Sequence, residues 1–205
     1  MAVVTISKNF GCGARDLGRR LAKRLGYAYI DKAYFQKIAE QLDVSERTLE
    51  SFEQGRQYRI ANIFSRLFSK NYIERIVGYD KTVIEEKEYQ EALRNLVIGV
   101  AQQGKVVLVG RASHIILKDL PNCYHFRIVA PVGWRKEYII REYGVRAIEA
   151  DSVLAERDRN REWFLRLMGG EGFDDPVRFH VIANVSLLSA EDIINLFVRI
   201  VQRTL

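Results

Sequence analysis

The chain alternates between short segments that are almost continuously apolar and longer segments with apolar residues at helical spacing. The apolar segments cover residues 2–6, 27–30, 106–110, 124–130 and 179–184. Strands that are apolar on both faces are typical of a parallel sheet covered by helices on each side. We therefore predict an α/β fold in three α/β/α layers, with one parallel strand for each of these five segments. In such sheets, ligands bind beyond the carboxyl ends of the strands.

The segments between the strands have the spacing of amphipathic helices. The first helix is predicted to begin at Ala14, and Gly26 is placed to end it. Residues 32–103 are predicted to be mostly helical, with amphipathic runs over 60–76 and 83–102. This stretch separates the first two strands from the other three, so it forms a helical insertion beside the sheet.

Three further helices are predicted in the second half of the chain. One carries Arg135 and Arg141, a charged helix covers 156–166, and Ser189 caps the last helix. No internal repeat, proline-rich linker or low-complexity tract interrupts the pattern, and 205 residues suit one packed domain. We therefore predict a single domain over 1–205.

A glycine-containing segment, Gly11-Cys12-Gly13, stands between the first strand and the first helix. Amide groups and the helix dipole attract phosphate at such a position, although a tight turn without a ligand has the same sequence. The segment does not fit a dinucleotide-binding fingerprint, and it departs from an intact Walker A loop. With Gly13 as the second Walker glycine, Lys8 takes the first glycine position, Ala14 the lysine position and Arg15 the Ser/Thr position.

Two other charged features follow predicted strands or lie on predicted helices. Arg111 comes directly after a buried strand and Gly110, where a guanidinium can hold a phosphate or simply lie on a surface turn. The run Glu156-Arg157-Asp158-Arg159-Asn160-Arg161 is dense in charge, and a solvated helix face has the same pattern. Neither feature is specific when taken alone.

The net charge of +6 favours anionic partners such as nucleotides or nucleic acid. Cys12 and Cys123 are far apart, which suits a reducing compartment and provides neither a disulfide framework nor zinc-ligand spacing, so no protein-bound metal is predicted. The chain has neither a signal-peptide pattern nor an apolar stretch long enough to span a membrane. A cytoplasmic protein without membrane partners is therefore expected.

Five short motifs in this order resemble the cytidylate kinases, a family of P-loop nucleoside-monophosphate kinases, and most closely their cytidylate kinase-like branch. They are Val4-Thr5-Ile6-Ser7 with Phe10-Gly11-Cys12-Gly13-Ala14-Arg15, Val109-Gly110-Arg111, Ala130-Pro131 with Arg135, Asp158-Arg159-Asn160-Arg161, and Asn184-Val185-Ser186 with Glu191. The resemblance implies a P-loop kinase fold with a degenerate Walker A loop. It also implies that residues 36–103 form an acceptor-side insertion and that residues 132–160 form a short lid.

The resemblance implies an acceptor site for CMP. Arg111 matches the arginine that contacts the acceptor phosphate, and Asp158 and Arg161 match the pair that reads cytosine and its phosphate. Asp31 matches an aspartate at the start of the acceptor-binding segment. Ala112 follows Arg111 where cytidylate kinases have aspartate, which is a departure from the family pattern.

The resemblance also implies a donor site for ATP with Mg²⁺. Arg135 matches a lid arginine, and Arg15, Arg135 and Arg141 are the predicted catalytic cations. The predicted phosphate loop consists of Lys8, Gly11, Cys12, Gly13, Ala14, Arg15 and Asp16. Because Ala14 cannot replace the Walker lysine, Arg15 or Lys8 has to supply that charge.

The leading hypothesis is an ATP-dependent phosphotransferase acting on a nucleoside monophosphate, CMP, dCMP or a relative. One alternative is a nucleotide-binding regulator of the same fold that has lost catalysis. Another is a nucleic-acid or anion-binding module, against which the absence of a recognisable nucleic-acid motif argues. A redox site at Cys12 is a further alternative, because a helix N-terminus lowers a thiol pKa. A homo-oligomer is left open.

Overall fold

A single sheet of five parallel strands forms the centre of the computed structural model, which describes residues 2–34, 86–169 and 171–203. The strands are β1 (Val3–Lys8), β2 (Ala28–Ile30), β3 (Val106–Val109), β4 (Cys123–Val129) and β5 (Val181–Asn184). Their order is β2-β3-β1-β4-β5, and all four neighbouring pairs are parallel. The prediction of a five-stranded parallel sheet is confirmed, and the first strand lies at its centre.

The last strand begins later than the sequence pattern predicted. A short 3₁₀ helix, η1 (Pro176–Arg178), precedes it, and the side chain of Asp175 accepts a hydrogen bond from the amide of Val177. Proline at the first position and a capping carboxylate favour a helical turn over an extended chain. The strand therefore covers Val181–Asn184 and not the whole of 179–184.

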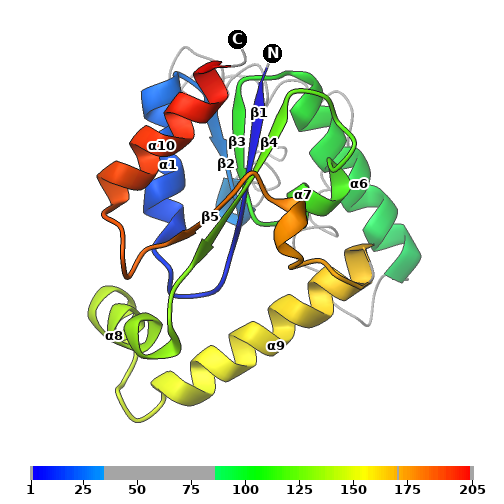
Figure 1. Ribbon diagram of the computed structural model, residues 1–205. Helices are drawn as coiled ribbons and strands as arrows, with labels where there is room; N and C mark the ends of the chain where they lie inside the picture. The colour runs from blue at the N-terminus through cyan, green and yellow to red at the C-terminus, as the bar shows by residue number, and fades with distance from the viewer. Residues whose placement is uncertain (1, 35–85, 170, 204–205) are drawn as a thin grey trace, which may run out of the picture.

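Helices cover both faces of the sheet, as predicted (Figure 1). One face is covered by α1 (Ala14–Leu25) and α10 (Ala190–Arg203), and the other by α6 (Glu86–Gln102), α7 (Ser113–Ile116) and the end of α9 (Ala150–Gly169). The rings of Phe126 in β4 and Phe197 in α10 stack at 3.9 Å between centroids. These apolar layers hold the sheet rigid, so that the loops at its carboxyl end have a fixed base.

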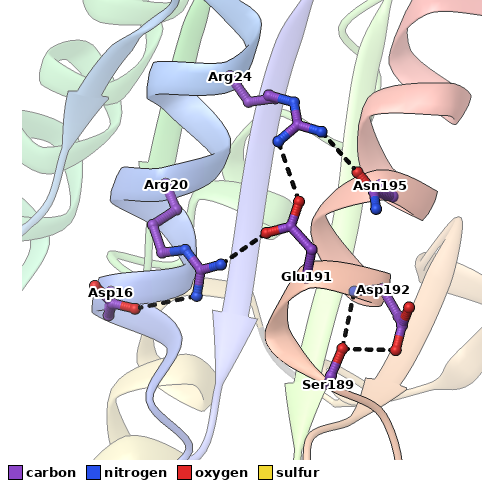
Figure 2. A network of polar contacts seen from close by, with 7 residues as sticks. All are labelled: Asp16, Arg20, Arg24, Ser189, Glu191, Asp192 and Asn195. Carbon is purple, nitrogen blue, oxygen red and sulfur yellow. Dashed lines mark hydrogen bonds and ion pairs between the residues drawn. The ribbon is translucent and has the colours of Figure 1, made fainter.

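The predicted ends of two helices are confirmed. Gly26 ends α1 in the left-handed conformation with φ 64°. The hydroxyl of Ser189 accepts a hydrogen bond from the amide of Asp192 at 3.2 Å and thereby caps α10 (Figure 2). Helix α6 corresponds to the predicted run over 83–102. The predicted helical run over 60–76 lies outside the described residues.

Polar contacts connect α1 and α10, the two helices that cover one face of the sheet (Figure 2). Glu191 accepts hydrogen bonds from Arg20 at 2.8 Å and from Arg24 at 3.1 Å, and Arg24 also donates to Asn195. Asp16, in the first turn of α1, lies 3.8 Å from Arg20. Asp16 therefore belongs to this surface network.

Helix α8 (Val132–Tyr143) and the first half of α9 lie beyond the carboxyl ends of the strands, as Figure 1 shows. Ile139 of α8 packs with Ala150 and Leu154 of α9 in an apolar cluster that Phe10 also contacts. The predicted lid residues thus have an apolar contact with the loop after β1. Within the described ranges, no helix combines the length and the apolar character that crossing a membrane requires.

Candidate functional site

The loop between β1 and α1 turns at two glycines with positive φ. Gly11 has φ 82° and Gly13 has φ 63°, and Gly13 is the N-cap of α1. No side chain in the described part of the chain caps this helix end. The first amides of α1 are therefore directed, with the positive end of the helix dipole, toward the carboxyl end of the sheet.

Side chains of α8 cover this loop closely. A Cβ atom at Gly11 would lie 3.0 Å from Ile139 Cγ2, and one at Gly13 would lie 3.2 Å from the hydroxyl of Tyr138. Positive φ and the lack of space both favour glycine at these two positions. The loop and the predicted lid therefore fit together as one unit.

The residues at the Walker lysine and Ser/Thr positions do not supply the usual groups. Ala14 is buried, whereas Arg15 is half-exposed, with its Nε 3.9 Å from a carboxylate oxygen of Asp31. Cys12 is buried too, and burial raises the pKa of its thiol. A raised pKa disfavours the thiolate that redox chemistry needs, so the structure gives no support to a redox site at Cys12.

Lys8, the last residue of the central strand β1, lies next to this loop. Its side chain is partly buried, and burial lowers its pKa, with Arg15 and Arg161 lowering it further through their positive charges. Arg15 pairs with Asp31 on one side of the loop. Of the two cations that the sequence left open as a replacement for the Walker lysine, Lys8 is therefore the more buried.

Asp31 is buried where the chain leaves β2. Its carboxylate accepts hydrogen bonds from the hydroxyl of Tyr29 and from the amide of Tyr34, each at 3.0 Å. With Arg15 nearby, Asp31 has three partners, and it therefore shapes the turn after β2. A direct contact between Asp31 and an acceptor stays a prediction.

Arg111 lies in a strained turn after β3. Gly110, Arg111 and Ala112 have successive φ values of 79°, 56° and 52°. A residue with a Cβ atom in this region costs about 1–2 kcal/mol, and such strain is typical of functional sites. Arg111 also lies near Lys32, whose pKa is lowered by burial first and then by the charges of Arg111, Arg157 and Arg15.

Arg135, which the resemblance matches to a lid arginine, forms a partly buried ion pair with Asp158. Its Nη1 and Nη2 donate to the two carboxylate oxygens at 2.9 and 2.8 Å, and Nη1 also donates to the carbonyl of Phe10 at 3.2 Å. Arg135 therefore connects α8, α9 and the phosphate loop. Arg141 lies apart from this group, because it is exposed and pairs with its neighbour Glu142 at 2.7 Å.

Asp158 and Arg161, three residues apart on α9, each pair with a different partner. Arg161 donates to Asp174 from Nη1 at 2.8 Å and from Nη2 at 2.6 Å, and Nη2 also donates to Ser7 Oγ at 3.1 Å. Arg127 of β4 forms a second ion pair with Asp174. The alternative of a solvated helix face therefore does not hold for Asp158 and Arg161.

Four charged residues at this end of the sheet were not among the predicted site residues: Lys32, Arg127, Arg157 and Asp174. Arg127 could have been noticed, since it interrupts an otherwise apolar strand. No feature of the sequence marked Asp174 as a site residue, because a single aspartate in a loop is common. Only the fold shows that it lies between two arginines.

The parallel sheet, the glycine loop between its central strand and first helix, and the converging cations together define a kinase-like protein of the P-loop class. The chain belongs to the cytidylate kinase-like family, whose sequence pattern it matches over residues 3–187. The fold class and the family resemblance predicted from the sequence are thereby confirmed. Among curated proteins, none matches this sequence.

Solved structures with the same fold share little sequence with the chain. An uncharacterized protein from Eubacterium ventriosum is 15% identical, with 98% of each chain covered and a TM-score of 0.65. Shikimate kinase from Acinetobacter baumannii, in complex with shikimate, is 13% identical, covering 100% of this chain and 94% of its own, with a TM-score of 0.54. A gluconokinase from Sinorhizobium meliloti is 13% identical, covering 99% and 93%, with a TM-score of 0.53. These likenesses support the fold.

Proposed function

We propose that the protein is an ATP-dependent phosphotransferase whose acceptor is a nucleoside monophosphate, CMP or a relative. The observation that carries the proposal is the convergence of cations on the carboxyl end of the sheet. Lys8 lies within the electrostatic influence of Arg15 and Arg161, and Lys32 lies within that of Arg111 and Arg157. Phosphoryl transfer brings two anions together, and a positive electrostatic potential offsets their repulsion.

Different residues would bind the donor and the acceptor phosphates. The amides of the Gly11–Arg15 turn would hold the phosphates of ATP at the N-terminus of α1, and Arg111 and Arg161 would hold the acceptor phosphate. An oxygen of the acceptor phosphate would then attack the γ-phosphorus in line. The bond between the γ-phosphorus and the oxygen that bridges it to the β-phosphate breaks, and ADP leaves with that oxygen. Lys8 would neutralise the charge that develops on the transferring group, a contribution typically of a few kcal/mol.

The residues described do not provide the usual magnesium ligand of a P-loop. Position 15 is arginine, so it has no hydroxyl, and the nearby carboxylate of Asp31 already binds Tyr29, Tyr34 and Arg15. Among the described residues, no three His, Cys, Asp or Glu side chains are grouped as metal ligands. Mg²⁺ would therefore enter with ATP, held by the nucleotide phosphates and water, as this ion commonly is.

One observation favours a second candidate, a nucleotide-binding protein of the same fold without catalysis. Ala14 is buried at the position of the Walker lysine, and Arg15 is half-exposed beside Asp31. If Lys8 does not reach the transferring phosphate, the loop binds a nucleotide without turnover. The two candidates share the binding site and differ only in that step.

The test is an assay of purified protein with ATP, Mg²⁺ and a panel of nucleoside monophosphates, nucleosides and small phosphate acceptors. Formation of ADP together with a new nucleoside diphosphate supports the proposal, and CMP or dCMP is the expected acceptor. A Lys8→Met variant, purified in parallel, controls for contaminating kinases, because their activity would persist in it. Nucleotide binding without turnover on any acceptor would establish the non-catalytic candidate.

The lid, the acceptor-side residues and the cellular location are parts of the same proposal. Residues 132–160 would close over the two phosphates as a lid, and residues 36–103 would contribute to the acceptor side. Because ATP and a nucleoside monophosphate would be the substrates, the cytoplasm is the proposed location.

A further inference from the structure

Asp174 lies between two arginines that come from different layers of the fold. It follows α9 and accepts two hydrogen bonds from Arg161 of that helix, at 2.6 and 2.8 Å. Its carboxylate also pairs with Arg127 of β4. The two arginine side chains are only 16% and 11% exposed, whereas Asp174 is 31% exposed. The carboxylate therefore faces solvent more than the guanidinium groups that bind it.

The charges around this carboxylate do not balance. Two guanidinium groups share one carboxylate, and Asp158 and Arg135 nearby pair with each other and so add no net charge. Burial, and after it the charge of Arg127, lower the pKa of Arg161 to about 10. A largely buried site with excess positive charge binds a dianion more favourably than a single carboxylate.

The hydrogen-bond donors of Arg161 decide whether a second anion can bind beside Asp174. Both terminal nitrogens are occupied by Asp174, and Nη2 also donates to Ser7 Oγ. A phosphate group bound bidentately by arginine uses the same fork of two parallel N–H groups. Asp174 and a phosphate therefore compete for one position.

We propose that Arg127 and Arg161 form a two-guanidinium subsite for the acceptor phosphate, and that Asp174 occupies it as an internal competitor which the acceptor displaces. The identity of the ligand as a nucleoside monophosphate rests on the proposed function. The competitor gives the site a selectivity, because a ligand without a phosphate dianion cannot displace a bound carboxylate. A nucleoside such as cytidine leaves Asp174 in place and makes no use of the two guanidinium groups, whereas its monophosphate displaces the carboxylate.

The test compares wild type with Asp174→Asn, which keeps the shape and removes the charge. Inorganic phosphate is titrated by calorimetry at low ionic strength, and the melting temperature is recorded with and without phosphate. Phosphate should bind Asp174→Asn about tenfold more tightly, because no carboxylate has to be displaced. It should also raise the melting temperature of the variant more than that of wild type. CMP should show the same gain, and cytidine should show none.

Two control variants are available in the chain. Glu191→Gln removes another carboxylate that two arginines share, Arg20 and Arg24, on the α1–α10 surface in Figure 2. Asp175→Asn removes the neighbouring carboxylate, which caps η1. Neither should change phosphate affinity, because neither carboxylate contacts Arg127 or Arg161. A gain in either control as large as in Asp174→Asn would mean that net charge explains the result, and would overturn the proposal.

Weaker or unchanged phosphate binding by Asp174→Asn would also overturn the proposal, since Asp174 would then position the arginines or have no role. If this variant does not fold, Arg127→Met alone leaves one guanidinium, that of Arg161, paired with Asp174. It should bind phosphate less tightly than wild type, and equal affinity would contradict the subsite. If phosphate behaves as expected but CMP binds no better than cytidine, the subsite stands as an oxyanion site and the proposed acceptor fails.

Discussion

Arg135 of α8 holds Asp158 of α9 with both ends of its guanidinium group, at 2.9 and 2.8 Å. Because the same arginine donates to the carbonyl of Phe10, this pair joins the predicted lid to the phosphate loop. Arg135 is buried, so its charge depends on Asp158 for compensation. The pair accordingly links the stability of this end of the fold to the geometry of the proposed donor site.

Replacing Asp158 with asparagine should lower the free energy of unfolding by about 3 kcal/mol, because it leaves a buried guanidinium without a counter-charge. Urea denaturation measures this change. Glu162→Gln, which breaks the exposed pair between Glu162 and Arg166, is the matched control and should cost less than about 1 kcal/mol. The double variant Arg135→Met with Asp158→Leu should recover part of the loss. Additive losses in that double variant would show that the pair is not coupled.

Arg111 offers a test that separates function from stability. Arg111→Gly removes a Cβ atom from a residue at φ 56°, so it should stabilise the fold by about 1 kcal/mol. It should also weaken the binding of every nucleoside monophosphate, while ATP binding stays close to that of wild type. Lys105→Gly is the control, since Lys105 has φ 51° at the opposite end of β3. It should give the same stabilisation with unchanged binding. Retained monophosphate binding in Arg111→Gly would remove Arg111 from the acceptor site.

Lys8→Met tests the residue that we assign to the transferring phosphate. Turnover should fall by about 10²-fold or more, with little change in the KM for the acceptor. The variant should melt no lower than wild type, because the pKa of Lys8 is lowered by burial and by the neighbouring arginines. A lowered lysine pKa means that the charged form is disfavoured in the fold. Full turnover in Lys8→Met that is lost in Arg15→Met would leave Arg15 as the cation that replaces the Walker lysine, whereas a contaminating kinase would persist in both variants.

Two buried histidines should make the fold sensitive to acid. Burial lowers the pKa of His114 and that of His125 to about 4, from the ordinary value of 6.5. Between these values the unfolded chain binds protons that the folded chain excludes. Stability is therefore complete above pH 6.5 and falls as the pH approaches 4, by at most about 1.4 kcal/mol per pH unit for each histidine. Urea denaturation at pH 7 and pH 5 measures the slope.

The contribution of these histidines can be isolated with variants. His114 contacts the carbonyl of Phe173 through Nε2, and His125 shares a 2.7 Å hydrogen bond with Thr5. The double variant His114→Gln with His125→Gln keeps polar groups at both positions and cannot titrate in this range. It should show a flatter dependence of stability on pH between 7 and 5. An unchanged slope would place the acid sensitivity elsewhere.

Local patterns determined the architecture of this protein. Mainly apolar strands of four to seven residues, such as Val106–Val109 and Cys123–Val129, are typical of a parallel sheet covered on both faces. The glycines at positions 11 and 13 determined the turn into α1, because few other residues adopt positive φ there. Helix ends followed from Gly26 and Ser189 for the same local reason. These features depend on residues that are close together along the chain.

The pairing of charges was decided by the tertiary structure alone. Asp158 and Arg161 are three residues apart on α9, yet each binds a residue brought from another element: Arg135 from α8 for one, and Asp174 with Ser7 for the other. An ion pair depends on which side chains the packed layers bring within about 4 Å, and sequence spacing does not fix that distance. The sequence thus indicated which residues carry charge at the end of the sheet. Only the packing of α8 and α9 against the strands determined that Asp174 occupies the guanidinium groups of Arg127 and Arg161.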